Sequence, residues 1–239
     1  MNTNAWIQDG YPKQSRWLKV ILLLLLFVVM DVIIQTGAAT YAMTGLGITN
    51  SNELLIALNA YPLYFLVPTV LWAGMFIVIL NRAGLPLFSG WQWNRKSIQR
   101  WLIGVILLII AQIGMANLTA WLYPNQLSSV NEQILESALP QMPLWKTVLV
   151  FSIYAPIREE VITRGLIMRY LFPKYPYIGM VISAVVFASL HVTTLWIHFL
   201  TYFLMGLIFS WVYYQTGRIE YSIGLHMFNN LVSTVPMYL

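Results

Sequence analysis

The sequence consists mainly of long apolar runs separated by short polar segments, and the length of these runs predicts the architecture. A helix that crosses a lipid bilayer needs roughly 20 mostly apolar residues. The chain of 239 residues contains seven candidates, at about 17–38, 54–81, 101–123, 144–171, 177–196, 197–215 and 220–238. The first two are clear, whereas His, Glu, Arg and Gly residues interrupt the last four. This pattern predicts an all-α, polytopic membrane bundle of about seven transmembrane helices.

A shorter pattern occupies the loop after the third candidate span, in SSVNEQILESALPQMP. Ser129 and Glu132 have the spacing of a capping box, in which each residue caps the other at a helix start. Val130, Ile134 and Leu135 then form an apolar stripe. We therefore expect a short amphipathic helix on the outer surface.

The composition agrees with a membrane protein. Charged residues make up 9% of the chain and hydrophobic residues 59%, whereas a soluble domain carries about 25% charged residues. The chain contains no cysteine, which excludes disulfides, a thiol nucleophile and thiolate metal ligands. No repeat or linker divides it, so we predict one membrane domain over 1–239, with generic spans in 1–143 and a motif-bearing core in 144–239.

The distribution of basic residues predicts the orientation, because cytoplasmic loops are enriched in Lys and Arg. The loops 39–53 and 124–143 contain neither residue. The alternate loops and span ends carry Lys13, Arg16, Lys19, Arg82, Arg95, Lys96, Arg100, Arg169, Lys174 and Arg218. We therefore expect a cytoplasmic amino terminus and an external carboxy terminus. The net charge of +5 reports this topology and does not indicate nucleic-acid binding.

Some features of the amino-terminal half allow alternatives. The basic start and apolar core of LKVILLLLLFVVMDV are also typical of a signal peptide. No good small-residue cleavage site follows, however, and the charge pattern needs this span. We expect Asp31, within it, to face other helices as a structural carboxyl. Trp91 and Trp93 are expected to anchor the chain at the cytoplasmic interface.

Ionisable side chains inside a bilayer are costly and indicate functional sites. In EEVITR, Glu160 and Arg164 are four residues apart, so they share a helix face and can pair. Such a partner offsets the burial of an arginine, which stays charged. Glu159 is rotated by ~100° from Glu160 and has no local partner, which suits a general base. A purely structural salt bridge is the alternative, although it explains neither the second glutamate nor the other polar clusters.

Two further polar clusters follow, FASLH with Phe187 and His191, and HMFNN with His226 and Asn230. His226 and Asn230 are four residues apart and can point two donors at a developing oxyanion. Taken alone, His191 would more often be a hydrogen-bonded core histidine, and the second pair could be polar glue between helices. His198 matches no motif and is interpreted as a histidine near the outer interface.

Helix geometry allows the three clusters to meet at one depth. Glu159 and His191 each lie ~20 Å from the hairpin that joins the fourth and fifth spans, and His226 lies ~9 Å inside its own helix. If that hairpin projects ~10 Å beyond the lipid, all three clusters meet about 10 Å below the cytoplasmic face. The projection is an assumption that makes the depths agree.

The motifs EEVITR, FASLH and HMFNN match EExxxR, FxxxH and HxxxN in order. The sequence thereby resembles the CAAX protease and bacteriocin-processing family (CPBP, or Abi) of intramembrane proteases, and it is similar to type II CAAX prenyl endopeptidases. About 144–239 carries the resemblance. With 239 residues and no long soluble domain, the chain looks like a bacterial member of this family, so we expect it in a bacterial plasma membrane. It implies peptide hydrolysis within or beside the membrane, in peptide processing or bacteriocin self-immunity. Glu160 and Arg164 would form a supporting pair.

The resemblance also implies roles at the remaining positions. Glu159 and His191 would activate a water molecule, and His226 and Asn230 would stabilise the oxyanion. Family members have often been described as metalloproteases, and Glu159, His191 and His226 could supply three zinc ligands with one open position. The prenyl-protease branch is described as working without a metal, and we favour direct activation of water.

Two other classes of function remain open. Buried Glu, His and Arg also form proton relays in transporters, although the chain shows no inverted repeat or paired broken helices. A non-catalytic membrane protein, such as an immunity or scaffold protein, is the third class. The expected partners are a peptide or membrane-protein substrate and the lipid bilayer, without nucleic acid.

Overall fold

The computed structural model describes residues 16–45, 62–88, 94–138 and 142–238, and within them every regular element is a helix. In chain order these are α2 (Trp17–Gly45), α4 (Pro62–Arg82), α5 (Arg95–Leu122), α6 (Val130–Ala138), α7 (Leu144–Thr147), η2 (Val148–Tyr154), α8 (Ala155–Glu160), η3 (Val161–Leu171), α9 (Pro176–Ser189), α10 (Trp196–Thr216), α11 (Ile219–Thr234) and η4 (Val235–Tyr238). The predicted all-α class is confirmed.

Three stretches of the described helices are long and apolar enough to cross a membrane: Trp17–Ile34, Arg95–Leu122 and Trp196–Thr216. Two shorter apolar helices are Val67–Arg82 and Pro176–Ser189. Six of the predicted spans coincide with a helix or a run of helices over their described residues. The fifth, 177–196, is helical only to Ser189, so His191 lies in the turn after α9 and not within a span. The count of seven stays a prediction. Trp91 and Trp93 lie outside the described residues.

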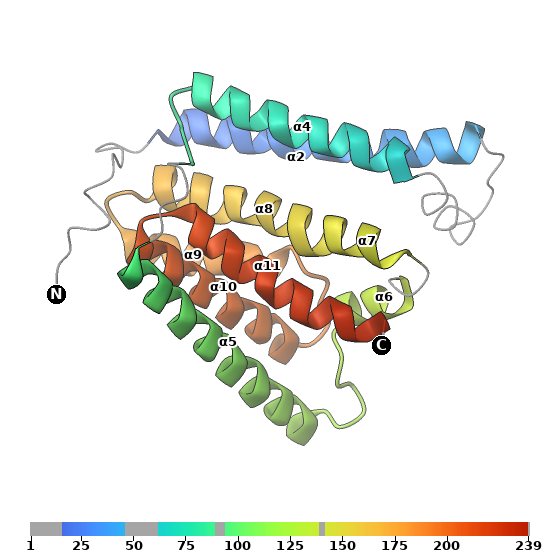
Figure 1. Ribbon diagram of the computed structural model, residues 1–239, viewed down its shortest axis with the longest axis vertical. Helices are drawn as coiled ribbons and strands as arrows, with labels where there is room; N and C mark the ends of the chain where they lie inside the picture. Colours follow the sequence, from blue (N-terminus) through green and yellow to red (C-terminus); the bar gives the residue numbers. More distant parts are fainter. Residues whose placement is uncertain (1–15, 46–61, 89–93, 139–141, 239) are drawn as a thin grey trace.

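The helices form a paired layer and a larger bundle (Figure 1). α2 and α4 run side by side, with Phe27, Trp72 and Phe76 in contact between them. This layer packs on η3, whose Leu166 and Tyr170 belong to the same apolar core. In the bundle α10 packs against α9, α5 and α11. The amino-terminal layer therefore supports η3 from outside the bundle.

Residues 144–171 form one continuous helical rod made of α7, η2, α8 and η3. The segments η2 and η3 are π-helical, with backbone bonds from residue i to residue i−5. π-helical turns are rare and frequently occur at functional sites. Glu159 and Glu160 end α8 directly before η3. The first predicted motif therefore lies at a change of helical pitch.

Several basic residues meet at one end of the molecule. The Arg16 guanidinium donates to the Gly84 carbonyl (2.8 Å), and the Lys19 ammonium donates to the Ala83 carbonyl. Arg169 of η3 donates to the Leu87 carbonyl (3.4 Å). The start of α2, the end of α4 and the end of η3 are thus joined at what we refer to as the basic end.

Helices α9 and α10 approach so closely at Gly206 that a side chain has no room. A Cβ atom added there would lie 3.0 Å from the Cα of Ala184 and 3.1 Å from Cδ1 of Phe187. The first of these neighbours is backbone, which cannot move without shifting α9. Gly114 of α5 offers a matched contrast, because an added Cβ would meet no described atom within 4 Å.

We predict that Gly206→Ala lowers the free energy of unfolding by about 1–3 kcal/mol through overpacking. Gly114→Ala should be neutral, or stabilise by up to about 1 kcal/mol, because alanine favours helix. Thermal unfolding of the two purified variants in detergent would measure this. Equal melting temperatures for the two variants would contradict the close α9–α10 contact.

Candidate active site

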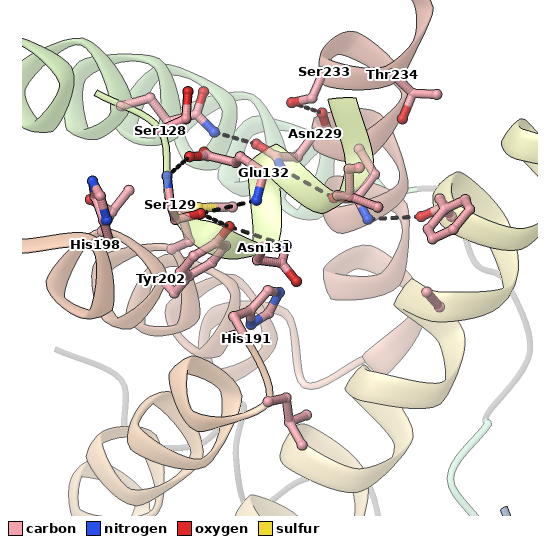
Figure 2. Close-up of a pocket in the computed structure, with 18 of the residues that line it drawn as sticks. Ser128, Ser129, Asn131, Glu132, His191, His198, Tyr202, Asn229, Ser233 and Thr234 are labelled. Carbon is pink, nitrogen blue, oxygen red and sulfur yellow. Dashed lines mark hydrogen bonds between the residues drawn. The ribbon is translucent and has the colours of Figure 1, made fainter. Parts of the chain in front are cut away.

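A cavity of about 600 Å³ lies inside the carboxy-terminal bundle. Its wall includes Glu159, His191, His226 and Asn230, which come from the rod, the loop after α9, and α11. Residues of α5, α6 and α10 complete the wall, and Figure 2 shows α6 residues across from His191. Four side chains predicted from three separate motifs therefore meet around one space.

Glu160 and Arg164 form the predicted ion pair beneath this cavity. Their atoms Oε1 and Nη1 are 3.0 Å apart, and both side chains are fully buried. Arg164 also donates to Thr163 Oγ1 and to the Gly206 carbonyl of α10, each at 2.6 Å. A buried charge is tolerated when it is paired and hydrogen-bonded in this way. The pair therefore ties the rod to α10.

Glu160 has further partners on α11, which the pairing with Arg164 alone did not predict. Ser222 Oγ donates to Glu160 Oε2 (2.5 Å), and His226 Nδ1 lies 3.1 Å from Glu160 Oε1. A carboxylate only accepts hydrogen bonds, so His226 donates through Nδ1. Both oxygens of Glu160 are thus occupied, and Glu160 holds the His226 ring in place.

Glu159 differs from Glu160 because one of its carboxylate oxygens is free. Its buried Oε2 has no hydrogen-bond partner and lies 3.9 Å from His226 Nε2. This distance is too long for a direct hydrogen bond. Separations of this kind are often bridged by water. The Glu159–His226 gap is therefore a suitable position for a water molecule inside the cavity.

His191 is fixed by the end of α9 and by α10. Its Nδ1 lies 2.9 Å from the Phe187 carbonyl, which can only accept, so Nδ1 carries the proton and Nε2 is left with a free lone pair when the ring is neutral. The ring stacks on Tyr202, with centroids 4.0 Å apart and 15° between the planes. Figure 2 shows Tyr202 beside Ser129, whose hydroxyl is 3.2 Å from the Tyr202 hydroxyl. The orientation of the His191 ring is therefore fixed by two contacts, the hydrogen bond to the Phe187 carbonyl and the stacking on Tyr202.

Asn230 makes a backbone contact that the spacing of the motif did not predict. Its Nδ2 donates to the Phe151 carbonyl (2.8 Å). In the π-helical pattern of this stretch, Pro156 would occupy the position that bonds to Phe151, but proline has no N–H. Asn230 supplies the missing donor. Its amide has a second N–H, which stays available for another acceptor.

The capping box predicted before α6 is present. The Ser129 amide donates to Glu132 Oε2 (2.7 Å), and the Glu132 amide donates to Ser129 Oγ (3.1 Å). The Asn131 amide also donates to the Val192 carbonyl (3.0 Å), in the loop that follows His191. The predicted helix is therefore confirmed, and its start packs on the cavity wall. The side chain of Ile134 lies outside the described part of the stripe.

Asp31 faces another helix, as predicted. Its Oδ2 lies 2.9 Å from Nη1 of Arg158, which also lines the cavity. Sequence reasoning missed Arg158, because its partner is 127 positions away. Ser222 could have been found, since it is four residues before His226 and shares its helix face. Tyr202 carries no comparable signal.

His198 is buried in the cavity wall, with 5% of its surface exposed and neither ring nitrogen hydrogen-bonded. The prediction placed it near the outer interface of the membrane. It stands near the start of α10, so it is close to a helix end but turned inward. Its two unpartnered nitrogens are available to a molecule in the cavity.

The metal-ligand set considered for zinc does not fit the geometry. Among the described residues no three His, Asp or Glu side chains are grouped so that they could hold a metal ion. Glu159, His191 and His226 all line the cavity, but they do not form such a group. We therefore derive no step through a metal.

The position of the cavity along the helices can be compared with the predicted depth. Its wall uses the second half of α5, the start of α10 and α11 from His226 onward. His226 is seven residues after the start of α11 at the basic end, which corresponds to ~10 Å. No membrane is present in the structure, so the depth of about 10 Å below the cytoplasmic face stays a prediction.

Fold and site together define a helical membrane protein with a carboxylate and two histidines around a buried cavity. Residues 140–232 match the family described as Type II CAAX prenyl endopeptidase Rce1-like. This confirms the predicted resemblance for the motif-bearing part of the chain. No solved structure matches the chain.

Two curated relatives are similar to the chain. It is 30% identical over 133 residues to YdiL of Bacillus subtilis (strain 168), named as a candidate membrane peptidase. It is 30% identical over 144 residues to MroQ of Staphylococcus aureus (strain USA300), named a membrane-embedded CAAX protease. The alignments cover 54% and 57% of this chain and 52% and 57% of the relatives. The chain thus spans about half the length of the curated relatives it matches, and these likenesses support the predicted class, an intramembrane protease.

We predict that the two adjacent glutamates differ sharply in their effect on stability. Glu160→Gln leaves Arg164 buried without its counter-charge and should cost about 3–5 kcal/mol. Glu159→Gln is the matched control, since it removes no hydrogen bond from Oε2 and should change the melting temperature little. Thermal unfolding in detergent would measure both. Similar losses for both variants would contradict the division between a structural and a free carboxylate.

Proposed function

We propose that the chain is an intramembrane endopeptidase of the CAAX-protease type, with Glu159 as general base. The observation that carries the proposal is the free Oε2 of Glu159, which lies in the cavity wall 3.9 Å from His226 Nε2. The likeness to the Rce1-like family and the name of MroQ support peptide hydrolysis as the reaction.

Glu159 would activate a water molecule in the cavity. Its carboxylate takes one proton from the water, and the free Nε2 of His191 accepts a hydrogen bond from the other. The resulting hydroxide attacks the carbonyl carbon of the peptide bond. When the C–N bond breaks, the proton on Glu159 passes to the leaving amine. Water supplies all the atoms that the two products gain, and Glu159 returns to the carboxylate.

His226 and Asn230 would stabilise the oxyanion of the tetrahedral intermediate. In this role His226 would donate through Nδ1 to Glu160 and through Nε2 into the cavity. Asn230 uses one N–H for the Phe151 carbonyl and offers the other to the oxyanion. Donors held by such contacts need little reorganisation during the reaction, which is the basis of oxyanion stabilisation.

The proposed substrates are peptides or segments of membrane proteins, and the proposed roles are peptide processing and bacteriocin self-immunity. An immunity role can be tested separately from cleavage. If Glu159→Gln still protected cells against a bacteriocin, the protein would act there by binding.

We predict that Glu159→Gln lowers the cleavage rate by at least about 100-fold, the contribution typical of general acid–base catalysis. The assay would use the purified protein in detergent with a mixture of quenched fluorescent peptides, and mass spectrometry of the products. Glu220→Gln, at the start of α11 and outside the cavity wall, is the control and should keep the wild-type rate. Full cleavage by the Glu159 variant would reject the assignment, and proton-dependent uptake into liposomes without cleavage would favour a transporter.

We also predict that the wild-type rate is unchanged after treatment with a metal chelator, because Glu159 and His191 activate water directly in the proposed reaction. Metal analysis of the same purified sample is the accompanying measurement. Stoichiometric zinc, together with loss of cleavage on chelation and recovery on zinc addition, would replace direct activation with a metal-dependent mechanism.

A further inference from the structure

The two ends of the bundle differ in charge, and this difference bears on which side of the membrane the cavity faces. Arg218 in the α10–α11 turn and Lys174 in the η3–α9 turn lie at the same end as the basic starts of α2 and α5. The opposite end contains the 124–143 loop, which has no Lys or Arg. Figure 1 shows the end of α11 beside α6 at this end.

All of the cavity wall belongs to the half of the bundle away from the basic end. α5 begins at the basic end and contributes only residues from Gln112 to Thr119. α10 runs toward the basic end and contributes only residues from His198 to Met205. α11 starts at the basic end and contributes residues from His226 onward. These three helices run in alternating directions, and each of them places the cavity away from the basic end.

A closed layer separates the cavity from the basic end. It consists of the Glu160–Arg164 pair with Phe209 and Ser222, and the side chains of all four are fully buried. Arg164 stands over the Phe209 ring at 5.5 Å, and the Ser222 hydroxyl oxygen lies 3.0 Å from the Phe209 carbonyl oxygen. None of these four side chains is exposed or lines the cavity. Access must therefore come from the end that carries α6 or from the side of the bundle near it.

The cavity wall reaches the surface at the loop before α6. Leu127 is 60% exposed and Glu132 is also exposed, and both line the cavity. Lys146 is a basic residue at this end, but it is 4% exposed and lies within the rod. Loops that lack Lys and Arg are typical of the extracytoplasmic side. The mouth and the basic end therefore lie on opposite sides of the membrane.

We propose that the cavity opens to the extracytoplasmic side, so that the site takes peptide bonds presented there by secreted peptides or by external segments of membrane proteins. A lipid-modified CAAX peptide displayed in the cytoplasm would meet the closed Glu160–Arg164 layer instead. The hydrolysis in this inference rests on the proposed function, whereas the side of access rests on the charge distribution and the position of the cavity.

The absence of cysteine allows a direct test of the side of access. Single substitutions Leu127→Cys at the mouth and Lys174→Cys at the basic end, both at exposed positions, would be treated with a membrane-impermeant maleimide in intact and in permeabilised cells. Leu127→Cys should be labelled equally in both. Lys174→Cys should be labelled at least about tenfold more after permeabilisation, as expected for a cytoplasmic basic loop. The reverse pattern would overturn the inference.

A second measurement separates this inference from the proposed function. Right-side-out membrane vesicles containing the wild-type protein would receive the quenched fluorescent peptides from outside, with Glu159→Gln vesicles as the control. Cleavage without permeabilisation, lost in the control, supports external access. Cleavage only after permeabilisation would reject external access and keep the protease. No cleavage under either condition would reject the protease, and the labelling pattern would then still decide the side.

Discussion

The buried ion pair between Glu160 and Arg164 is the interaction on which the rest of the site depends. An arginine cannot lose its charge in a protein interior, so its burial has to be balanced by a carboxylate and by hydrogen-bond acceptors. Arg164 donates a hydrogen bond to the Gly206 carbonyl of α10, and Glu160 accepts hydrogen bonds from Ser222 and His226 of α11. Satisfying one buried charge therefore fixes three segments of the chain relative to one another. Gly206 also lies at the close α9–α10 contact, and its carbonyl oxygen accepts the hydrogen bond from the Arg164 guanidinium.

The same pair explains how two adjacent glutamates acquire different roles. One helical step turns Glu159 by ~100° from Glu160, which moves it from the closed layer into the cavity wall. Glu160 then has both oxygens occupied, whereas Oε2 of Glu159 has none of its bonding capacity used. His226 stands between the two carboxylates, at 3.1 Å from one and 3.9 Å from the other. A structural contact on one side of the ring thus aims its second nitrogen at the Glu159 carboxylate.

Sequence reasoning succeeded where contacts follow a helical repeat and failed where they depend on the path of the chain. The Glu160–Arg164 pair and the Ser129–Glu132 cap are local, so spacing was sufficient to predict them. The contact between Asn230 and Phe151 depends on a π-helical register and on a proline that breaks it, which no periodicity reveals. The stacking of Tyr202 on His191 depends on the course of the loop between α9 and α10. The depth of the site stays a prediction, because distances along helices say nothing about where the lipid begins.

The residues that indicate the side of access differ from the residues assigned to the proposed reaction. The match to the Rce1-like family covers 140–232 and contains every residue assigned to water activation and oxyanion binding. Much of the basic charge that indicates orientation lies before it, in the loops around α2, α4 and α5. A shared set of motifs can therefore be inserted with either end in the cytoplasm, as the flanking loops dictate. In the proposed reaction, the Glu160–Arg164 layer lies on one side of the cavity only, so the charge of these loops would decide which compartment supplies the substrate.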